Sequence, residues 1–212
     1  GGSLARLGRR TPNLPRLRWP RRLGVISFDA GSTSPYEAAV STYSWTHTCT
    51  GPNRGLLVGV SLFGAGTVSN VTYAGAGLTF VRADANGVYR TEVWRLANPA
   101  TGANTVEVTL SASLTSIAEA ASYNGVDQTN PVEANAGANG SGGAPSGSVT
   151  PLTAAAWVAQ AISTADTTVA PVAPATRRAV NSGALGSGGF SDRGPVNPAA
   201  STTLTWEDVG AL

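Results

Sequence analysis

Short segments in which apolar and polar residues alternate recur along this chain, separated by turn residues. These segments are rich in Val, Thr and Tyr and are bounded by Gly, Asn and Pro, a pattern typical of strands with one buried face. Segment 105–110, for example, places Val106, Val108 and Leu110 on one face. The predicted strands are 25–28, 39–48, 56–63, 68–73, 78–82, 89–96, 105–110, 117–123, 148–151, 155–163, 176–181 and 201–206. Their spacing predicts an all-β protein, specifically an antiparallel β-sandwich of jelly-roll type.

Three segments, rich in alanine or glycine, do not follow the alternating pattern. The alanine-rich stretch 152–162 resembles a helix in composition, but Trp157, Val158 and Ile162 lie between turn-rich flanks, so we predict a strand. Segment 135–147 is rich in Gly, Asn and Ser and predicts a flexible surface loop or a linker between strands. Segment 181–198 predicts a long glycine-rich loop.

The N-terminal segment 1–22 differs in charge from the rest of the chain. It holds seven arginines and no acid, whereas the remainder carries seven basic and twelve acidic residues. Pro12, Pro15 and Pro20 block a continuous helix, and large apolar residues alternate with the arginines. We therefore predict an extended arm, 1–22, that docks on a partner, followed by a single β-sandwich domain, 23–212; the alternative is a solvated basic tail. The residues expected to bind the partner are Arg6, Arg9, Arg10, Leu14, Arg16, Leu17, Arg18, Trp19, Arg21 and Arg22.

The sequence offers little that would support catalysis. His47 is the only histidine and Cys49 the only cysteine, so a zinc site lacks further Cys or His ligands and no internal disulfide can form. A Cys–His dyad would need a third orienting group, and the acids are scattered singly apart from Glu207 and Asp208. We interpret His47 and Cys49 as a structural pair and expect a protein that is not an enzyme and uses no cofactor or metal.

The charge distribution also narrows the choice of partner. The arm alone could contact phosphates, but the body offers no basic face to continue such a track. An acidic protein surface is therefore favoured over nucleic acid. Because no run of 18 apolar residues exists, we expect no membrane-spanning helix and no membrane partner.

Four stretches together resemble a known group of modules: NRGLLVGV at 53–60, VTYAGAGLT at 71–79, VWRLANPATGANTVEVT at 93–109 and SYNGVDQTNP at 122–131. As a set they are similar to β-sandwich modules of tailed-phage virion proteins and of related prophage and bacterial surface proteins. The resemblance covers about residues 42–131 and continues more loosely to Trp206.

The resemblance implies a non-catalytic component that decorates or reinforces a capsid or tail lattice. Its partners would then be a major capsid or tail protein and copies of itself, and its location the virion, assembled in the host cytoplasm. Two alternatives remain: a carbohydrate- or host-surface-binding module of a fibre or secreted bacterial protein, and a hydrolase. Exposed aromatic side chains on a concave sheet face would favour sugar binding.

Overall fold

The computed structural model describes residues 24–140 and 144–208, in which every regular element is a β-strand. The strands are β1 (Ser27–Thr33), β2 (Glu37–Cys49), β3 (Gly55–Phe63), β4 (Val68–Tyr73), β5 (Ala76–Gly77), β6 (Thr79–Asn86), β7 (Tyr89–Ala97), β8 (Gly102–Asn124), β9 (Ser146–Val149), β10 (Ala156–Thr164), β11 (Val169–Pro171), β12 (Thr176–Gly183), β13 (Gly186–Val196) and β14 (Thr202–Asp208).

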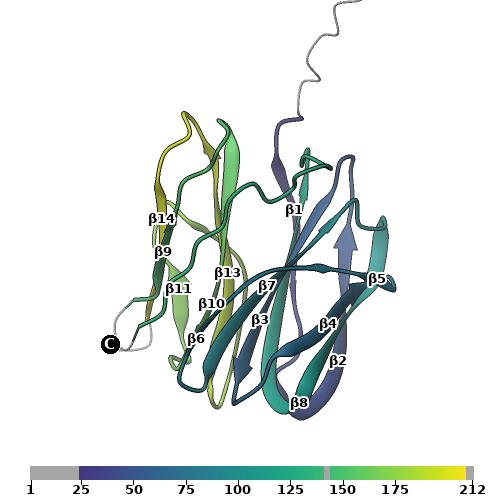
Figure 1. Ribbon diagram of the computed structural model, residues 1–212, viewed down its shortest axis with the longest axis vertical. Coiled ribbons are helices and arrows are strands. Elements are labelled where there is room, and N and C mark those ends of the chain that lie inside the picture. The colour runs from purple at the N-terminus through teal and green to yellow at the C-terminus, as the bar shows by residue number, and fades with distance from the viewer. Residues whose placement is uncertain (1–23, 141–143, 209–212) are drawn as a thin grey trace, which may run out of the picture.

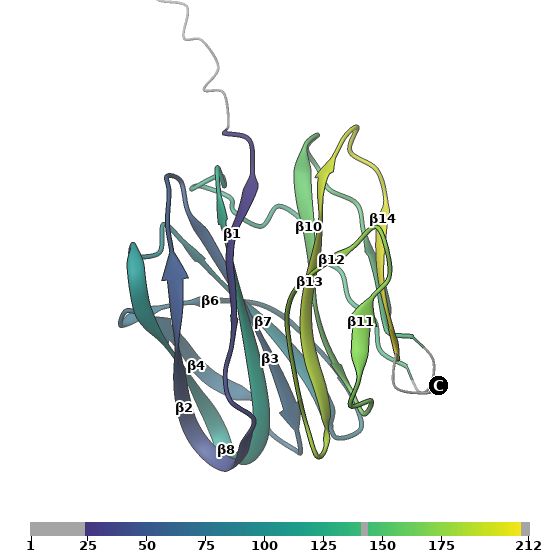
Figure 2. The same ribbon diagram turned by 180° about the vertical axis from the view of Figure 1, so that it is seen from behind.

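The strands form three sheets in which all pairings are antiparallel. The large sheet has eight strands in the order β5-β4-β8-β3-β7-β6, with β1 and β2 also paired to β8. The middle sheet has the order β10-β13-β12 and the outer sheet the order β11-β14-β9. Figure 1 and Figure 2 show them as successive layers, with the middle sheet between the other two. The predicted all-β antiparallel sandwich is confirmed, whereas the jelly-roll connectivity and the single-domain boundary stay predictions.

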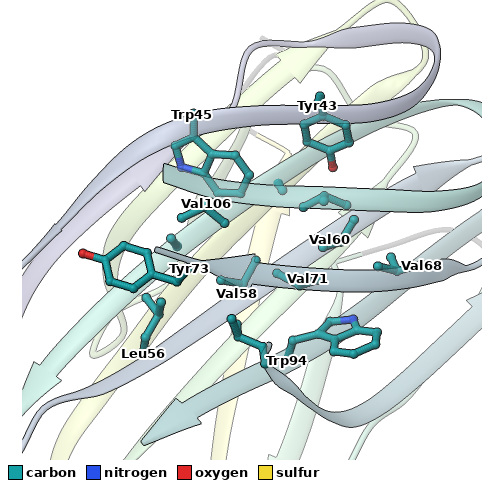
Figure 3. Packing of buried hydrophobic residues seen from close by; sticks show 14 of the residues in the cluster. Tyr43, Trp45, Leu56, Val58, Val60, Val68, Val71, Tyr73, Trp94 and Val106 are labelled. Carbon is teal, nitrogen blue, oxygen red and sulfur yellow. The ribbon is translucent and has the colours of Figure 1, made fainter. Parts of the chain in front are cut away.

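The main core lies on one face of the large sheet. Alternate residues of β3, among them Leu56, Val58 and Val60, are buried in this core, as expected for strands with one side facing apolar neighbours. They pack with the aromatic rings of Tyr73 and Trp94 and with further side chains from β2, β4 and β8 (Figure 3). The other face of the large sheet contacts the middle sheet through a second cluster that includes Tyr123 and Phe190.

The long strand β8 differs from the prediction. Segments 105–110 and 117–123 were expected to be two strands, but both belong to β8. The intervening residues, SASLTS at 111–116, include no Gly, Pro, Asn or Asp that would favour a turn. The strand therefore continues, pairing with β2 and β4 through its first half and with β1 and β3 through its second.

The prediction of a glycine-rich loop at 181–198 is wrong. This segment contains the end of β12 and all of β13, the central strand of the middle sheet. Both faces of β13 are covered. A Cβ at Gly188 would collide with the Glu119 carboxyl group on the large sheet, and a Cβ at Gly189 would lie 2.6 Å from the Trp206 ring on the outer sheet. Glycine is needed here because it permits close approach of both neighbouring layers.

Two other predictions, a strand in the alanine-rich stretch 152–162 and a loop at 135–147, are confirmed. The alanine-rich stretch forms β10, a strand rather than a helix. Segment 125–145 connects the large sheet to β9 with no regular strand among its described residues, in agreement with the loop expected at 135–147. The structure also contains two short strands that were not predicted, β5 and β11.

Candidate functional site

The described residues enclose a groove of about 840 Å³. Its walls come from β6 and β7 of the large sheet, from β10 of the middle sheet and from β9 of the outer sheet. Strands β6, β9 and β10 each lie at the edge of their sheet. The groove therefore lies where three sheet edges meet, and the segment between β8 and β9 borders it at 136–140.

An ion pair and two amides fix one wall of this groove. Arg82 donates through Nε and Nη2 to the two carboxylate oxygens of Asp84, at 2.8 and 2.7 Å, and this hydrogen bonding raises the pKa of Arg82. The remaining Arg82 nitrogen, Nη1, donates to Asn135 Oδ1 at 3.1 Å. Asn86 donates to the Gly140 carbonyl oxygen. The connecting segment is thus attached to β6 by side-chain hydrogen bonds.

The opposite wall is formed in part by β10, and two polar side chains of this strand each contain a buried atom without a hydrogen-bond partner in the described part of the chain. Gln160 Oε1 and Ser163 Oγ, both on β10, have no hydrogen-bond partner among the described residues. A buried polar atom without a partner carries a desolvation penalty. Both residues line the groove together with Arg82, Asp84 and Asn86, so several polar side chains belong to its lining and the groove is the candidate ligand site.

Aromatic side chains give this groove little stacking surface. Trp45, Trp94 and Trp206 are buried in the sandwich. Phe80 is 47% exposed but packs edge-on against Trp94 and does not line the groove. Tyr89 does line it, with its ring packed edge-on against Phe63. The exposed aromatic platform that would favour sugar stacking is absent from the described groove residues.

The predicted structural pair, His47 and Cys49, lies in the core. Both side chains are buried on the same face of β2 as Trp45. Trp45 Nε1 donates to Ser32 Oγ at 2.9 Å, and the Ser32 hydroxyl is 2.8 Å from His47 Nδ1. The Ser32 hydroxyl therefore bridges Trp45 and His47, whereas His47 Nε2 is buried with no hydrogen-bond partner among the described residues.

Burial makes the His47 imidazole a weaker base and the Cys49 thiol a weaker acid. It lowers the pKa of His47 to about 4, despite a partly opposing effect of Asp29. It also raises the pKa of the Cys49 thiol. At neutral pH the imidazole is uncharged and the sulfur is protonated, which disfavours proton transfer and nucleophilic attack. The described residues also contain no group of three or more His, Cys, Asp or Glu side chains placed to hold a metal ion.

Glu119 was not among the residues predicted from the sequence to matter for function. This side chain is fully buried between the large and middle sheets, and neither carboxylate oxygen has a hydrogen-bond partner among the described residues. Burial raises the pKa of Glu119 well above its usual value. A usable signal was present, because in the predicted strand 117–123 alternation puts Glu119 on the same face as Ile117 and Tyr123.

The Glu119→Gln variant is expected to be more stable than the wild type above pH 4.5 and equally stable near pH 4. The folded protein keeps Glu119 protonated while the unfolded chain ionises it, so raising the pH through 4.5 favours unfolding. The free energy of unfolding of the wild type then falls by about 1.4 kcal/mol per pH unit until the carboxyl group ionises in the folded protein. Urea denaturation at a series of pH values measures it, with Glu107→Gln, on an exposed side chain, as the matched control. Equal pH profiles for wild type and Glu119→Gln would contradict the prediction.

A second buried acid, Asp192, holds the large and middle sheets together. Its Oδ2 accepts hydrogen bonds from Arg178 Nε at 2.8 Å and from the Tyr123 hydroxyl at 2.7 Å. The guanidinium carbon of Arg178 lies 3.9 Å from the centre of the Phe28 ring. Trp157 packs edge-on against Tyr123 in the same cluster. This combination of ion pair, phenol and aromatic rings links β1 and β8 with β12 and β13.

The arm residues expected to bind a partner, Arg6 to Arg22, lie outside the described residues, so their role stays a prediction. None of the described residues forms a helix with the length and apolar character needed to cross a membrane. Comparisons with protein-family models, with curated proteins and with solved structures found no match to this chain.

Proposed function

We propose that this protein is a non-catalytic structural module of a phage virion, which decorates or reinforces a capsid or tail lattice and is anchored by its arginine-rich arm. The proposal that the protein is non-catalytic is supported by the burial of its reactive groups. His47, Cys49 and Glu119 are each at most 1% exposed, so a substrate in solvent has no route to these three groups, whose perturbed pKa values would otherwise make them candidates for an active site. The virion as the assembly rests on the sequence resemblance.

The body of the protein suits a structural role. Strand β13 is covered by sheets on both sides, and hydrogen bonds from Ser61 and Tyr123 link the large sheet to the middle sheet. Only 12% of the residues are charged, which leaves a surface of small and polar side chains suited to contact with neighbouring subunits. The seven arginines of the arm provide the attachment, and the apolar residues among them provide contacts that salt does not screen.

The test of this proposal is truncation. A protein that starts at Leu23 is expected to fold with the same β-rich circular dichroism spectrum but to fail to join assembled particles, as measured by density-gradient centrifugation of particles produced with each variant. A matched variant that keeps every arginine but changes Leu14, Leu17 and Trp19 to Ser separates apolar contact from charge. Incorporation of the truncated protein at the wild-type level would refute arm-mediated anchoring.

A second candidate function is binding of a surface glycan in the groove, favoured by the polar side chains in its lining, which include Asn86, Gln160 and Ser163. Hydroxyl groups of a sugar can form hydrogen bonds with such side chains. A printed array of bacterial surface polysaccharides would test it, comparing the wild type with Gln160→Leu and with the control Gln128→Leu, a change outside the groove. Equal array profiles for all three proteins would exclude glycan binding at this site.

A further inference from the structure

The chain contains three Asn-Gly pairs, at 86–87, 124–125 and 139–140. An asparagine followed by glycine is prone to deamidation, because glycine has no Cβ to hinder attack of its backbone nitrogen on the asparagine Cγ. The attack forms a five-membered succinimide ring and expels ammonia, and water then opens the ring. The glycine N–H and the carboxamide must be free to meet, so the fold determines which of the three pairs can react.

The fold restrains Asn124 on both sides of this reaction. The Gly125 N–H donates to the Pro52 carbonyl oxygen at 3.2 Å. The Asn124 carboxamide is confined, because its Oδ1 is buried and a Cβ at Gly51 would lie 2.5 Å from that atom. Asn124 also ends β8 and pairs with Ser27 of β1. Ring closure at this position would have to disrupt these contacts.

Asn86 is exposed, but two other contacts restrain it. It is the last residue of β6 and pairs with Tyr89 across the hairpin between β6 and β7. Closure of a succinimide requires the extended backbone of such a residue to rotate, which this pairing resists. The Asn86 amide nitrogen, which the reaction would expel, donates to the Gly140 carbonyl oxygen. Both contacts slow deamidation at Asn86.

Asn139 lies in the most open environment of the three. Asn139 and Gly140 are both exposed and lie outside the regular strands. Neither the Asn139 side chain nor the Gly140 backbone nitrogen has a hydrogen-bond partner among the described residues. A Cβ at Gly140 would meet no atom within 4 Å. The nucleophile and the carboxamide of this pair are therefore free to approach each other.

We propose that Asn139 is a site of spontaneous modification, which converts it to aspartate and isoaspartate in the folded protein while Asn86 and Asn124 are preserved. The Gly140 nitrogen bonds to Asn139 Cγ, the Cγ–Nδ2 bond breaks, and the proton of the Gly140 N–H passes to solvent as ammonia leaves. One water molecule is then consumed. Its attack on the side-chain carbonyl gives aspartate, and its attack on the main-chain carbonyl gives isoaspartate. This inference is independent of the proposed virion role.

The modification alters the border of the groove. Asn139 lines the groove with Asp84 and Asp166, so either product adds a negative charge to that lining. An isoaspartate also routes the main chain through the former side chain, which inserts a methylene group before Gly140. The Gly140 carbonyl oxygen then moves relative to Asn86, which weakens the hydrogen bond between this segment and β6.

Peptide mapping of the folded full chain during incubation at mildly alkaline pH tests the proposal. Cleavage after glutamate places the three asparagines on different peptides, 38–92, 120–133 and 134–207. Asn139 is expected to deamidate about tenfold faster than Asn86 or Asn124, which corresponds to a barrier lower by about 1.4 kcal/mol. In urea, where the restraining contacts are lost, all three should react at similar rates. Equal rates in the folded protein, or an Asn139 that reacts only in urea, would overturn the proposal.

Two matched variants identify the nucleophile. Gly140→Ala adds a methyl group that has space in the folded protein but hinders attack on Cγ, so it should slow deamidation of Asn139 about tenfold. Gly77→Ala, on a glycine with equally open surroundings in β5, should leave the rate unchanged. A rate that is the same in Gly140→Ala and in the wild type would rule out attack by the Gly140 nitrogen.

Hydrogen exchange tests the effect on the groove border. After equal incubation, backbone amides in 134–140 are expected to exchange faster in the wild type than in Gly140→Ala, because only the wild type has accumulated isoaspartate. Fresh samples of the two proteins provide the baseline. Exchange that does not change as the wild type deamidates would show that the contact between Asn86 and Gly140 survives the modification.

Discussion

Replacing Arg178 with Met is expected to lower the free energy of unfolding by about 3–5 kcal/mol at pH 7. Arg178 is the only basic side chain that forms an ion pair with Asp192 among those found in the described residues, and Asp192 is 1% exposed. Methionine retains much of the apolar volume over Phe28 but supplies no charge. The buried carboxylate would keep only the Tyr123 hydroxyl as a partner.

The size of this effect follows from desolvation rather than from the strength of the ion pair. A buried charge that loses its partner retains the full penalty of its removal from water. The loss would be a large part of a typical total stability of about 5–15 kcal/mol. Urea denaturation monitored by tryptophan fluorescence measures it, since Trp157 belongs to the same cluster.

Two further variants separate the buried pair from a general effect of removing arginine. Arg177→Met changes the adjacent, exposed arginine and should alter stability by no more than about 0.5 kcal/mol. The double variant Arg178→Met with Asp192→Asn removes the charge together with its partner and should recover much of the loss. A single Arg178→Met variant as stable as Arg177→Met would show that the cluster does not join the sheets.

The second large effect is expected from acid. In a Glu119→Gln background, the free energy of unfolding should fall by about 3 kcal/mol between pH 7 and pH 4. Burial lowers the pKa of His47 to about 4, whereas an unfolded histidine titrates near 6.5. Between these values the unfolded chain binds a proton that the folded protein does not, so stability is complete above 6.5 and is lost as the pH falls toward 4.

The Glu119→Gln background is needed because His47 and Glu119 change the stability in opposite directions as the pH falls. From pH 6.5 down to 4.5, protonation of unfolded His47 favours unfolding, while return of the proton to unfolded Glu119 favours folding. In the wild type these terms largely cancel in that window. Glu119→Gln leaves the histidine effect visible.

The measurement is urea denaturation at half-unit pH steps from 4 to 8. A double variant with His47→Gln and Glu119→Gln serves as the control and should lose little stability over the same range. Asp29 does not interfere, because hydrogen bonds from Thr50 and Ser122 outweigh its burial and lower its pKa, so its contribution disappears only at more acidic pH. An equal acid-induced loss in the double variant would assign the effect to groups other than His47.

Most strands could be predicted from local sequence patterns alone. Alternation with turn residues predicted β4 with its observed bounds and placed β2, β3, β7 and β10 close to theirs. The burial of Trp45, His47 and Cys49 on one face also follows from their spacing of two residues. These are local properties, because a half-buried strand imposes its period on its own residues.

The roles of the glycines in segment 186–189 and of the buried acids Glu119 and Asp192 depend on the tertiary structure. Segment 186–189 has a loop-like composition, yet it is a central strand because Glu119 and Trp206 approach it closely from opposite sides. The partner of Asp192 depends on strand register, which shifts between Arg177 and Ala179 and so leaves Arg178 out of the regular pairing. The close approaches and the ion pair join residues on different strands, so no local pattern specifies them. The stacking of the sheets determines the close approaches, and the pairing of β12 with β13 determines the ion pair.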